Sequence, residues 1–199
     1  MPVIIGIVLW DKLPDKLPAH WNYKGEVDMY LHKILWMLMP TFVAVSVLIF
    51  FKLLPYVDPK NNYDFFRKTL YDILVVVSLF MLTIFTFIVL STLGNYDPLT
   101  FILYAAAVLI LLMGNFLGKL RPSFFLGIRT PWTLGNDSVW IKTHRFSGIW
   151  WVVLSFSALV IFPFSGSHIF KVFIAYVTLV MIIPFGYSFY SYMQNKKEK

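Results

Sequence analysis

The chain has 199 residues, of which 59% are hydrophobic and only 14% are charged, and its mean hydropathy is +0.72. Soluble domains carry about a quarter of charged residues, so this composition excludes an ordinary soluble protein and indicates an integral membrane protein. The absence of cysteine excludes disulfides, thiolate nucleophiles and thiolate metal sites. The net charge of +7 arises from lysines and arginines that flank apolar runs, so direct binding of nucleic acid is not expected.

The first element along the chain is the apolar run of residues 2–10, which is too short to cross a bilayer. Nine helical residues cover about 14 Å, whereas the hydrocarbon core is about 30 Å thick. The run predicts either a partial or re-entrant helix or the remainder of a full first helix, and the second interpretation is favoured.

The polar stretch that follows contains two Leu-Pro pairs, at residues 13–14 and 17–18. They require extended or turn backbone and forbid a continuous helix there. Gly25 is expected at a turn. The rings of Trp21, Tyr23 and Tyr30 are suited to the headgroup layer. Two interpretations remain open: an interfacial plug over the helices, or a rigid aromatic recognition surface with a polar rim.

Three side chains in this stretch form a weak candidate metal set. Asp28 and His32 are four residues apart and would share one face of a helix, and His20 precedes them. Such residues near a headgroup layer are more often solvated, so no metal and no cofactor is expected.

Five further segments are long and apolar enough to span a bilayer. Pro40 should kink the first of them unless neighbouring helices satisfy the freed carbonyl. With residues 2–10 counted as a short first span, the sequence predicts an all-α bundle of about six spans and no soluble domain. The five segments are residues 33–55, 70–93, 98–118, 146–165 and 168–190.

The stretch "LGIRTPWTLGNDSVWIKTHRF", residues 126–146, interrupts these apolar runs. Its Thr130-Pro131 bond forbids helix at Thr130. Just before it, Gly114 and Gly118 have the G-x-x-x-G spacing that lets a second helix approach closely.

The second half of the stretch predicts a short helix that ends at residue 146 and is capped by Asn136 or Asp137. On it Trp140 and His144 would share a face. Lys142 and Arg145 would contact lipid phosphates or carboxylates of a partner protein. The alternative is an ordinary basic loop beside the membrane, with tryptophan anchors.

Orientation follows from the distribution of lysine and arginine. With the C-terminus in the cytoplasm, twelve of these residues fall inside and five outside, as the positive-inside rule requires. The predicted organisation is a partial first helix and an outer segment (1–32), three spans (33–118), a cytoplasmic motif loop (119–145), and two spans with a basic tail (146–199). The protein is thus expected in a cell membrane as a multi-pass chain.

The two polar stretches together resemble a known family. "GIRTPWTLGNDSVWIKTHRFSG" is similar to the signature of the SdpI family of bacterial membrane immunity proteins, and "LPDKLPAHWNYKGEVD" resembles the small domain of unknown function that often precedes it. The resemblance implies an outer recognition set: Pro18, His20, Trp21, Asn22, Gly25 and Asp28. It implies an inner, cytoplasmic set, to which the charge of Lys142 is added: Asn115, Gly127, Arg129, Thr130, Pro131, Trp132, Thr133, Leu134, Trp140, Arg145 and Phe146.

The resemblance also implies a function. The type member of the family protects a bacterium from its own secreted killing peptide. Loaded with toxin, it also holds a cytoplasmic repressor at the membrane. The expected partners of this chain are therefore the bilayer, a secreted membrane-active peptide and a cytoplasmic repressor, while the oligomeric state is left open.

The competing function is an enzyme or carrier for a lipid-like or phosphate-bearing substrate, with Arg129 binding the phosphate. The sequence shows no metalloprotease, hydrolase or phosphate-loop motif, so no catalytic residue is expected. Asp72 is the only acid within the predicted spans and lies about one turn from the start of its span, which disfavours ion-coupled transport.

Overall fold

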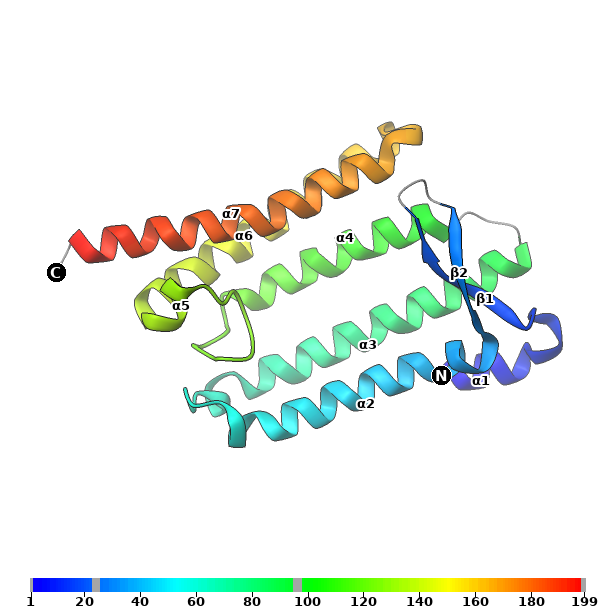
Figure 1. Cartoon of the computed structure of the whole chain (residues 1–199), viewed down its shortest axis with the longest axis horizontal. Coiled ribbons are helices and arrows are strands. Elements are labelled where there is room, and N and C mark those ends of the chain that lie inside the picture. Colours follow the sequence, from blue (N-terminus) through cyan, green and yellow to red (C-terminus); the bar gives the residue numbers. More distant parts are fainter. Residues whose placement is uncertain (1, 23–25, 95–97, 198–199) are drawn as a thin grey trace.

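The computed structural model describes residues 2–22, 26–94 and 98–197 (Figure 1). The N-terminal part contains α1 (Pro2–Val8), a 3-10 turn (Trp10–Lys12), β1 (Lys16–Trp21) and β2 (Val27–His32). The rest contains α2 (Lys33–Val57), α3 (Tyr63–Gly94), α4 (Pro98–Leu117), α5 (Pro131–Gly135), α6 (Asp137–Ile161), two 3-10 turns (Phe162–Phe164 and Gly166–His168) and α7 (Ile169–Lys197).

The predicted membrane architecture is confirmed. Within the described ranges, five helices are long and apolar enough to cross a bilayer: α2, α3, α4, α6 with its following turn, and α7 with its preceding turn. α1 has seven residues and is far shorter than a span. The fold is all-α except for one small antiparallel hairpin, β1–β2, which the sequence predicted only as extended backbone.

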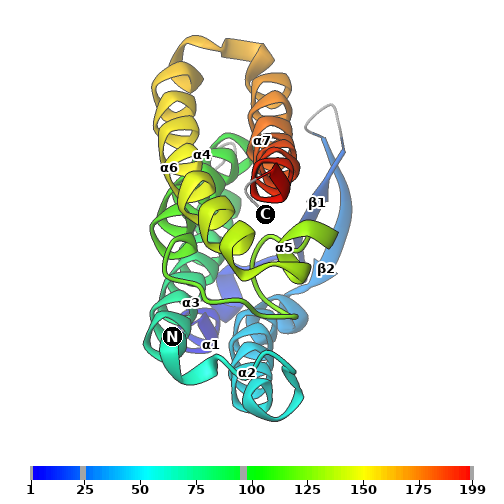
Figure 2. The same ribbon diagram turned by 90° about the vertical axis from the view of Figure 1, so that its left-hand side faces the viewer.

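The five long helices form a curved row in the order α2, α3, α4, α6 and α7, because each packs mainly against its neighbours in that order. Figure 2 looks along the helix axes and shows α5 and the hairpin on the same side of the row. Figure 1 shows that they cover opposite ends of the helices. The two stretches singled out in the sequence therefore lie at opposite ends of the bundle.

α4 and α6 are in close contact at a pair of glycines. A Cβ at Gly114 would lie 2.9 Å from the carbonyl oxygen of Gly148, and a Cβ at Gly148 would lie 2.7 Å from the carbonyl oxygen of Gly114. Gly118 continues the contact against the backbone and stem of Arg145. The predicted role of the G-x-x-x-G pair is confirmed: it removes side chains so that two backbones meet.

α6 and α7 are joined by hydrogen bonds that suit an apolar environment. Pro184 has no N–H, so the carbonyl of Val180 one turn earlier has no helical partner. Trp151 Nε1 donates to that carbonyl at 3.0 Å. The hydroxyls of Ser155 and Tyr176 lie 2.6 Å apart, one turn further along both helices. The antiparallel register of these two helices is thus fixed by polar contacts as well as by packing.

Two expectations about element boundaries are wrong. The short helix at 137–146 and the span at 146–165 are one continuous helix, α6, because no residue between them breaks the helical backbone. α3 begins at Tyr63, so Asp72 is its tenth residue and lies deeper than one turn from the helix start. The helical bounds of α2 include Pro40, so the proline does not end that helix.

The hairpin corrects a third expectation. Asp28 and His32 lie on a strand, not on a shared helix face, and His32 caps α2 by accepting the N–H of Ile34 at 3.3 Å. The expected turn at Gly25 falls outside the described residues.

We predict that the hairpin and α5 lie on opposite membrane faces, with α5 in the cytoplasm, because most of the cations gather at the α5 end. Single cysteines at Glu26 and Ser138, both exposed, test this in a chain that has no cysteine of its own. A membrane-impermeant maleimide applied to intact cells should label only position 26. Equal labelling of both positions without lysis would contradict the assignment.

Candidate functional site

The candidate site is the motif loop, residues 119–136, together with the first turns of α6. Trp140 and His144 on α6 are completely buried, with exposed fractions of 0% and 1%. Their rings stack with centroids 4.1 Å apart and planes 19° apart. Trp140 Nε1 donates to the carbonyl of Leu120 at 3.1 Å, and His144 Nε2 accepts the N–H of Ile128 at 2.8 Å. One stacked pair therefore holds the motif loop at two points.

Hydrogen bonding also determines which nitrogen of His144 carries the proton. Nε2 must present a lone pair, because it accepts an N–H. Nδ1 lies 2.9 Å from the carbonyl of Trp140, so Nδ1 carries the proton and donates it. The ring is held as one neutral tautomer, and a second proton on Nε2 would break the bond to the loop.

Gly127 permits this contact. Its φ is +96°, and a Cβ there would lie 2.4 Å from His144 Nε2. Any side chain at residue 127 would therefore displace the imidazole from the loop.

The middle of the loop is closed by a reciprocal pair of threonines. Thr130 has extended backbone, as the following proline requires, and caps α5 by accepting the N–H of Thr133 at 3.2 Å. Thr133 Oγ1 accepts the N–H of Thr130 at 2.8 Å and donates to the carbonyl of Ile128 at 2.8 Å. Both threonines are buried, and Pro131 occupies the first helical position.

Aromatic contacts attach the site to α7. Trp132 packs edge-on against Phe185 with centroids 5.4 Å apart, and its centroid lies 5.0 Å from that of Phe189. Phe146 on α6 stacks on Tyr187, with centroids 3.8 Å apart and planes 5° apart. Leu134, in α5, is half-buried. Sequence analysis assigned Trp132 and Phe146 to the motif without placing them, and both lie against α7.

The beginning of the loop is held by Asp58, which sequence reasoning missed. Asp58 caps α2, is buried, and accepts hydrogen bonds from the hydroxyl of Ser123 and from the N–H of Phe124 at 3.3 Å. Asn62 donates to the carbonyl of Pro122 at 3.0 Å. The cluster of Asp and Asn after an apolar run is a turn signal, but its partners lie about sixty residues further along the chain.

Arg129 makes a specific contact within the motif loop. Its Nη1 donates to the carbonyl of Phe124 at 3.1 Å, although the side chain is largely exposed. With Gly127 and Thr130 it lines a cavity of about 530 Å³ between the motif loop and α7.

Three other members of the inner set lie elsewhere. Lys142 and Arg145 are exposed on α6, and Asn115 is exposed on α4, where its amide donates to the carbonyl of Leu111 at 3.2 Å. Asn115 and Arg145 line a groove beside the glycine contact, away from the loop interior.

Trp140 cannot contact a partner protein alongside the two exposed cations, because its ring is fully buried. Trp140 supports the loop from within. The sequence could not distinguish a buried ring from an interfacial one, since tryptophan is common in both places.

At the opposite end, the hairpin brings much of the outer set together. His20 Nδ1 lies 2.6 Å from Asp28 Oδ1 across the strands. Asn22, after β1, and Glu26, before β2, exchange hydrogen bonds of 3.0 and 3.1 Å. Pro18 pairs with Tyr30 in the strand register.

Lys33 is the outer residue that sequence reasoning missed. It is only 6% exposed, and its side chain donates to the backbone carbonyl of Trp10 at 3.2 Å. The Lys33 ammonium also lies 4.1 Å from the centroid of the Trp10 ring and pairs with the carboxylate of Asp15 at 3.3 Å. Trp36 Nε1 donates to the carbonyl of Leu17 at 3.3 Å. These contacts, with Trp21 packed on the same apolar cluster, fix the hairpin on the start of α2.

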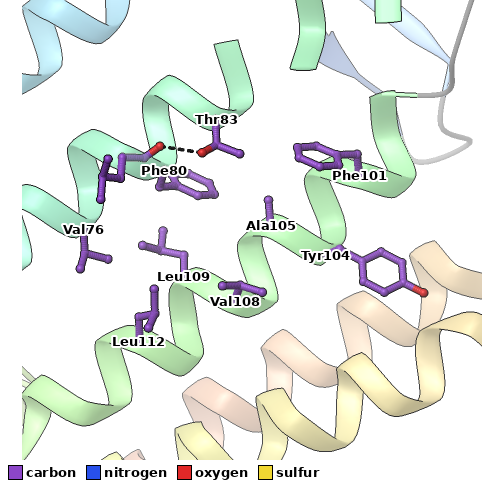
Figure 3. A pocket seen from close by; sticks show the side chains of 10 residues that line it. Val76, Phe80, Thr83, Phe101, Tyr104, Ala105, Val108, Leu109 and Leu112 are labelled. Carbon is purple, nitrogen blue, oxygen red and sulfur yellow. Dashed lines mark hydrogen bonds between the residues drawn. The ribbon is translucent and has the colours of Figure 1, made fainter. Parts of the chain in front are cut away.

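Another pocket, of about 340 Å³, lies between α3 and α4 (Figure 3). Its lining includes Phe80, Phe101 and Leu109, and the hydroxyl of Thr83 is committed to the carbonyl of Leu79 at 2.9 Å. It holds no charged residue and no member of the predicted sets. Among the described residues no group of three His, Asp or Glu side chains is placed to bind a metal.

We predict that Gly127→Ala destabilises the protein by about 1–3 kcal/mol, through strain at positive φ and overlap with His144. Gly135→Ala is the matched control in the same loop, because a Cβ at residue 135 would meet no neighbouring atom within 4 Å. Thermal unfolding in detergent measures both. Equal stability of the two variants would show that the contact is not tight.

Comparison with known proteins agrees with the resemblance. Residues 119–188 match the SdpI/YfhL protein family, and residues 1–45 match DUF1648, a domain of unknown function. The chain is 24% identical over 190 residues to Immunity protein SdpI of Bacillus subtilis (strain 168), covering 95% of this chain and 89% of that protein. No solved structure matches the chain. The outer motif noted in the sequence thus lies within the DUF1648 match and the inner motif within the SdpI/YfhL match, and the chain is similar to that immunity protein along nearly its whole length.

Proposed function

We propose that this chain is a membrane immunity protein that protects its cell against a secreted, membrane-active peptide. The observation that carries the proposal is the alignment with a protein named for immunity, which covers nearly the whole of both chains. The matched region includes the hairpin, the motif loop and all five long helices, so the similarity is not confined to one short motif.

The hairpin is the surface proposed to meet the peptide. Tyr30 is 54% exposed and Met29 48% exposed, with His20 on the adjacent strand. A rigid surface that presents an aromatic and a thioether side chain loses little conformational entropy when it binds an apolar peptide. Leu17 beneath it is fully buried and fixes its position.

The motif loop is the proposed cytoplasmic output, which holds a repressor at the membrane. Lys142 and Arg145 are the exposed cations that would meet an acidic patch, while the buried Trp140 keeps the loop in shape behind them. A single helix, α2, links the two ends: it begins at Lys33, which is bonded to the N-terminal segment, and is capped at its other end by Asp58, which is bonded to the motif loop. This provides a direct physical route for a signal.

For the cavity lined by Arg129, ligand binding is favoured over catalysis. Arg129 is the one charged residue among those that line the cavity, and no described residue pairs a nucleophile with a base there. An enzyme acting on a phosphate-bearing substrate would need such a pair or a metal.

We predict that expression of the chain in a sensitive strain raises survival when cells are challenged with a panel of secreted membrane-active peptides. The double variant His20→Ala/Tyr30→Ala should reduce survival, because it removes exposed side chains of the hairpin. The double variant Lys142→Glu/Arg145→Glu should leave survival intact and lower induction of a repressor-controlled reporter. Survival and induction are measured at matched membrane levels of protein.

Phe164→Ala is the control for the hairpin variant, because Phe164 is 86% exposed and lies outside the hairpin, in the segment between α6 and α7, which is at the same end of the bundle (Figure 1). Equal loss of survival in both would show that any exposed aromatic side chain at that end contributes. If no peptide in a broad panel is tolerated better with the protein than without it, the immunity proposal fails.

A further inference from the structure

The cavity beside the motif loop has the form of a site for an amphipathic ligand. Its walls come from α3, α4, α6, α7 and loop residues 126–130, and nearly all of its side chains are apolar. Thr130 is bonded to Thr133, and the indole nitrogen of Trp151 is bonded to Val180. Apart from Arg129, the polar side chains of the lining are therefore already satisfied within the protein.

The polar side of the cavity is cationic. A guanidinium has five N–H groups, and that of Arg129 donates to the carbonyl of Phe124 through Nη1. No carboxylate in the described part of the chain forms an ion pair with it. Lys119 lies 5.3 Å from the centroid of Phe116, whose ring forms part of the wall. An anionic group of a ligand would therefore complement Arg129 and Lys119 on the polar side of the cavity.

The apolar side opens toward lipid. Met181 and Phe185 line the cavity on α7 and are 65% and 55% exposed, on a helix of spanning length. A ligand can thus enter sideways from the bilayer. A helix with its side chains is about 10 Å across. The cavity of about 530 Å³ would therefore hold at most about five residues of a helical peptide. The volume falls within the range of about 300–1,000 Å³ that is usual for small ligands.

We infer that the cavity binds one anionic phospholipid, with an acyl chain against α7 and the phosphate on Arg129. The lipid would complete the wall formed by residues 126–130 and stabilise the motif loop, because a ligand that binds only the folded arrangement favours it. This site is separate from the proposed peptide surface, which lies at the other end of the bundle. It does not depend on the immunity proposal.

The test uses the purified full chain in detergent with mixed phosphatidylglycerol and phosphatidylcholine micelles, and native mass spectrometry measures lipid retention. Arg129→Gln should lower phosphatidylglycerol affinity about tenfold, the order expected for a hydrogen bond to a charged group. Arg121→Gln, an exposed cation of the same loop outside the cavity, should leave affinity within about twofold. Met181→Trp should fill the cavity and abolish retention, whereas Met193→Trp, further along α7, should not.

Three results would overturn the inference. Equal losses in Arg129→Gln and Arg121→Gln would show diffuse attraction to anionic lipid. Unchanged retention in Met181→Trp would place the acyl chain elsewhere. Displacement of the lipid by inorganic phosphate alone would indicate a site for free phosphate. Met181 is mostly exposed, so its variant tests the site even if Arg129→Gln fails to fold.

Discussion

The buried stack of Trp140 on His144 determines where the motif loop lies. Nineteen residues separate α4 from α6, and α5 supplies their one helix of five residues. Loops of that length are uncommon in compact domains unless they are held by specific contacts or serve a function. Here the indole binds the start of the loop and the imidazole binds its centre, so two adjacent rings replace a regular element.

The same helix that carries this stack also organises the rest of the inner end. Asn136 caps the start of α6, because its side chain accepts the N–H groups of Ser138 and Val139 at 2.9 and 3.1 Å. One face of α6 then meets α4 at Gly148, and further along Trp151 binds α7. Any change in the tilt of α6 must therefore move the loop, the cavity wall and the α7 contact together, because packed helices have few alternative arrangements.

Local rules predicted much of this architecture. The spans follow from hydropathy, the break at Thr130 from the proline after it, and the glycine contact from the spacing of residues 114 and 118. The rules failed where the deciding partner is distant in sequence. Nothing near Asp58 indicates that its carboxylate will cap residues 123–124, and nothing near Trp140 indicates that its ring turns inward.

The hairpin shows a second kind of limit. Two Leu-Pro pairs required extended backbone in the first strand, but they did not specify a partner strand. The pairing of the two strands follows from the burial of Leu17 against Trp36 and from the contacts of Lys33 beneath the hairpin. Only the folded chain brings these residues together. Spacing alone predicted that Asp28 and His32 share a helix face. A spacing of four residues places two side chains on one helix face only where the backbone is helical.

Hydrogen exchange of the motif loop tests the central role of the stack most directly. His144→Phe keeps an aromatic ring on Trp140 but leaves the buried N–H of Ile128 without an acceptor, at a cost of about 1–3 kcal/mol. Peptides covering residues 121–134 should then exchange about ten to a hundred times faster, while those of α3 and α7 stay unchanged. His168→Phe, at the opposite end of α6 and α7, is the control. Loop exchange at the wild-type rate in His144→Phe would show that the loop is held without the imidazole, and would contradict the account.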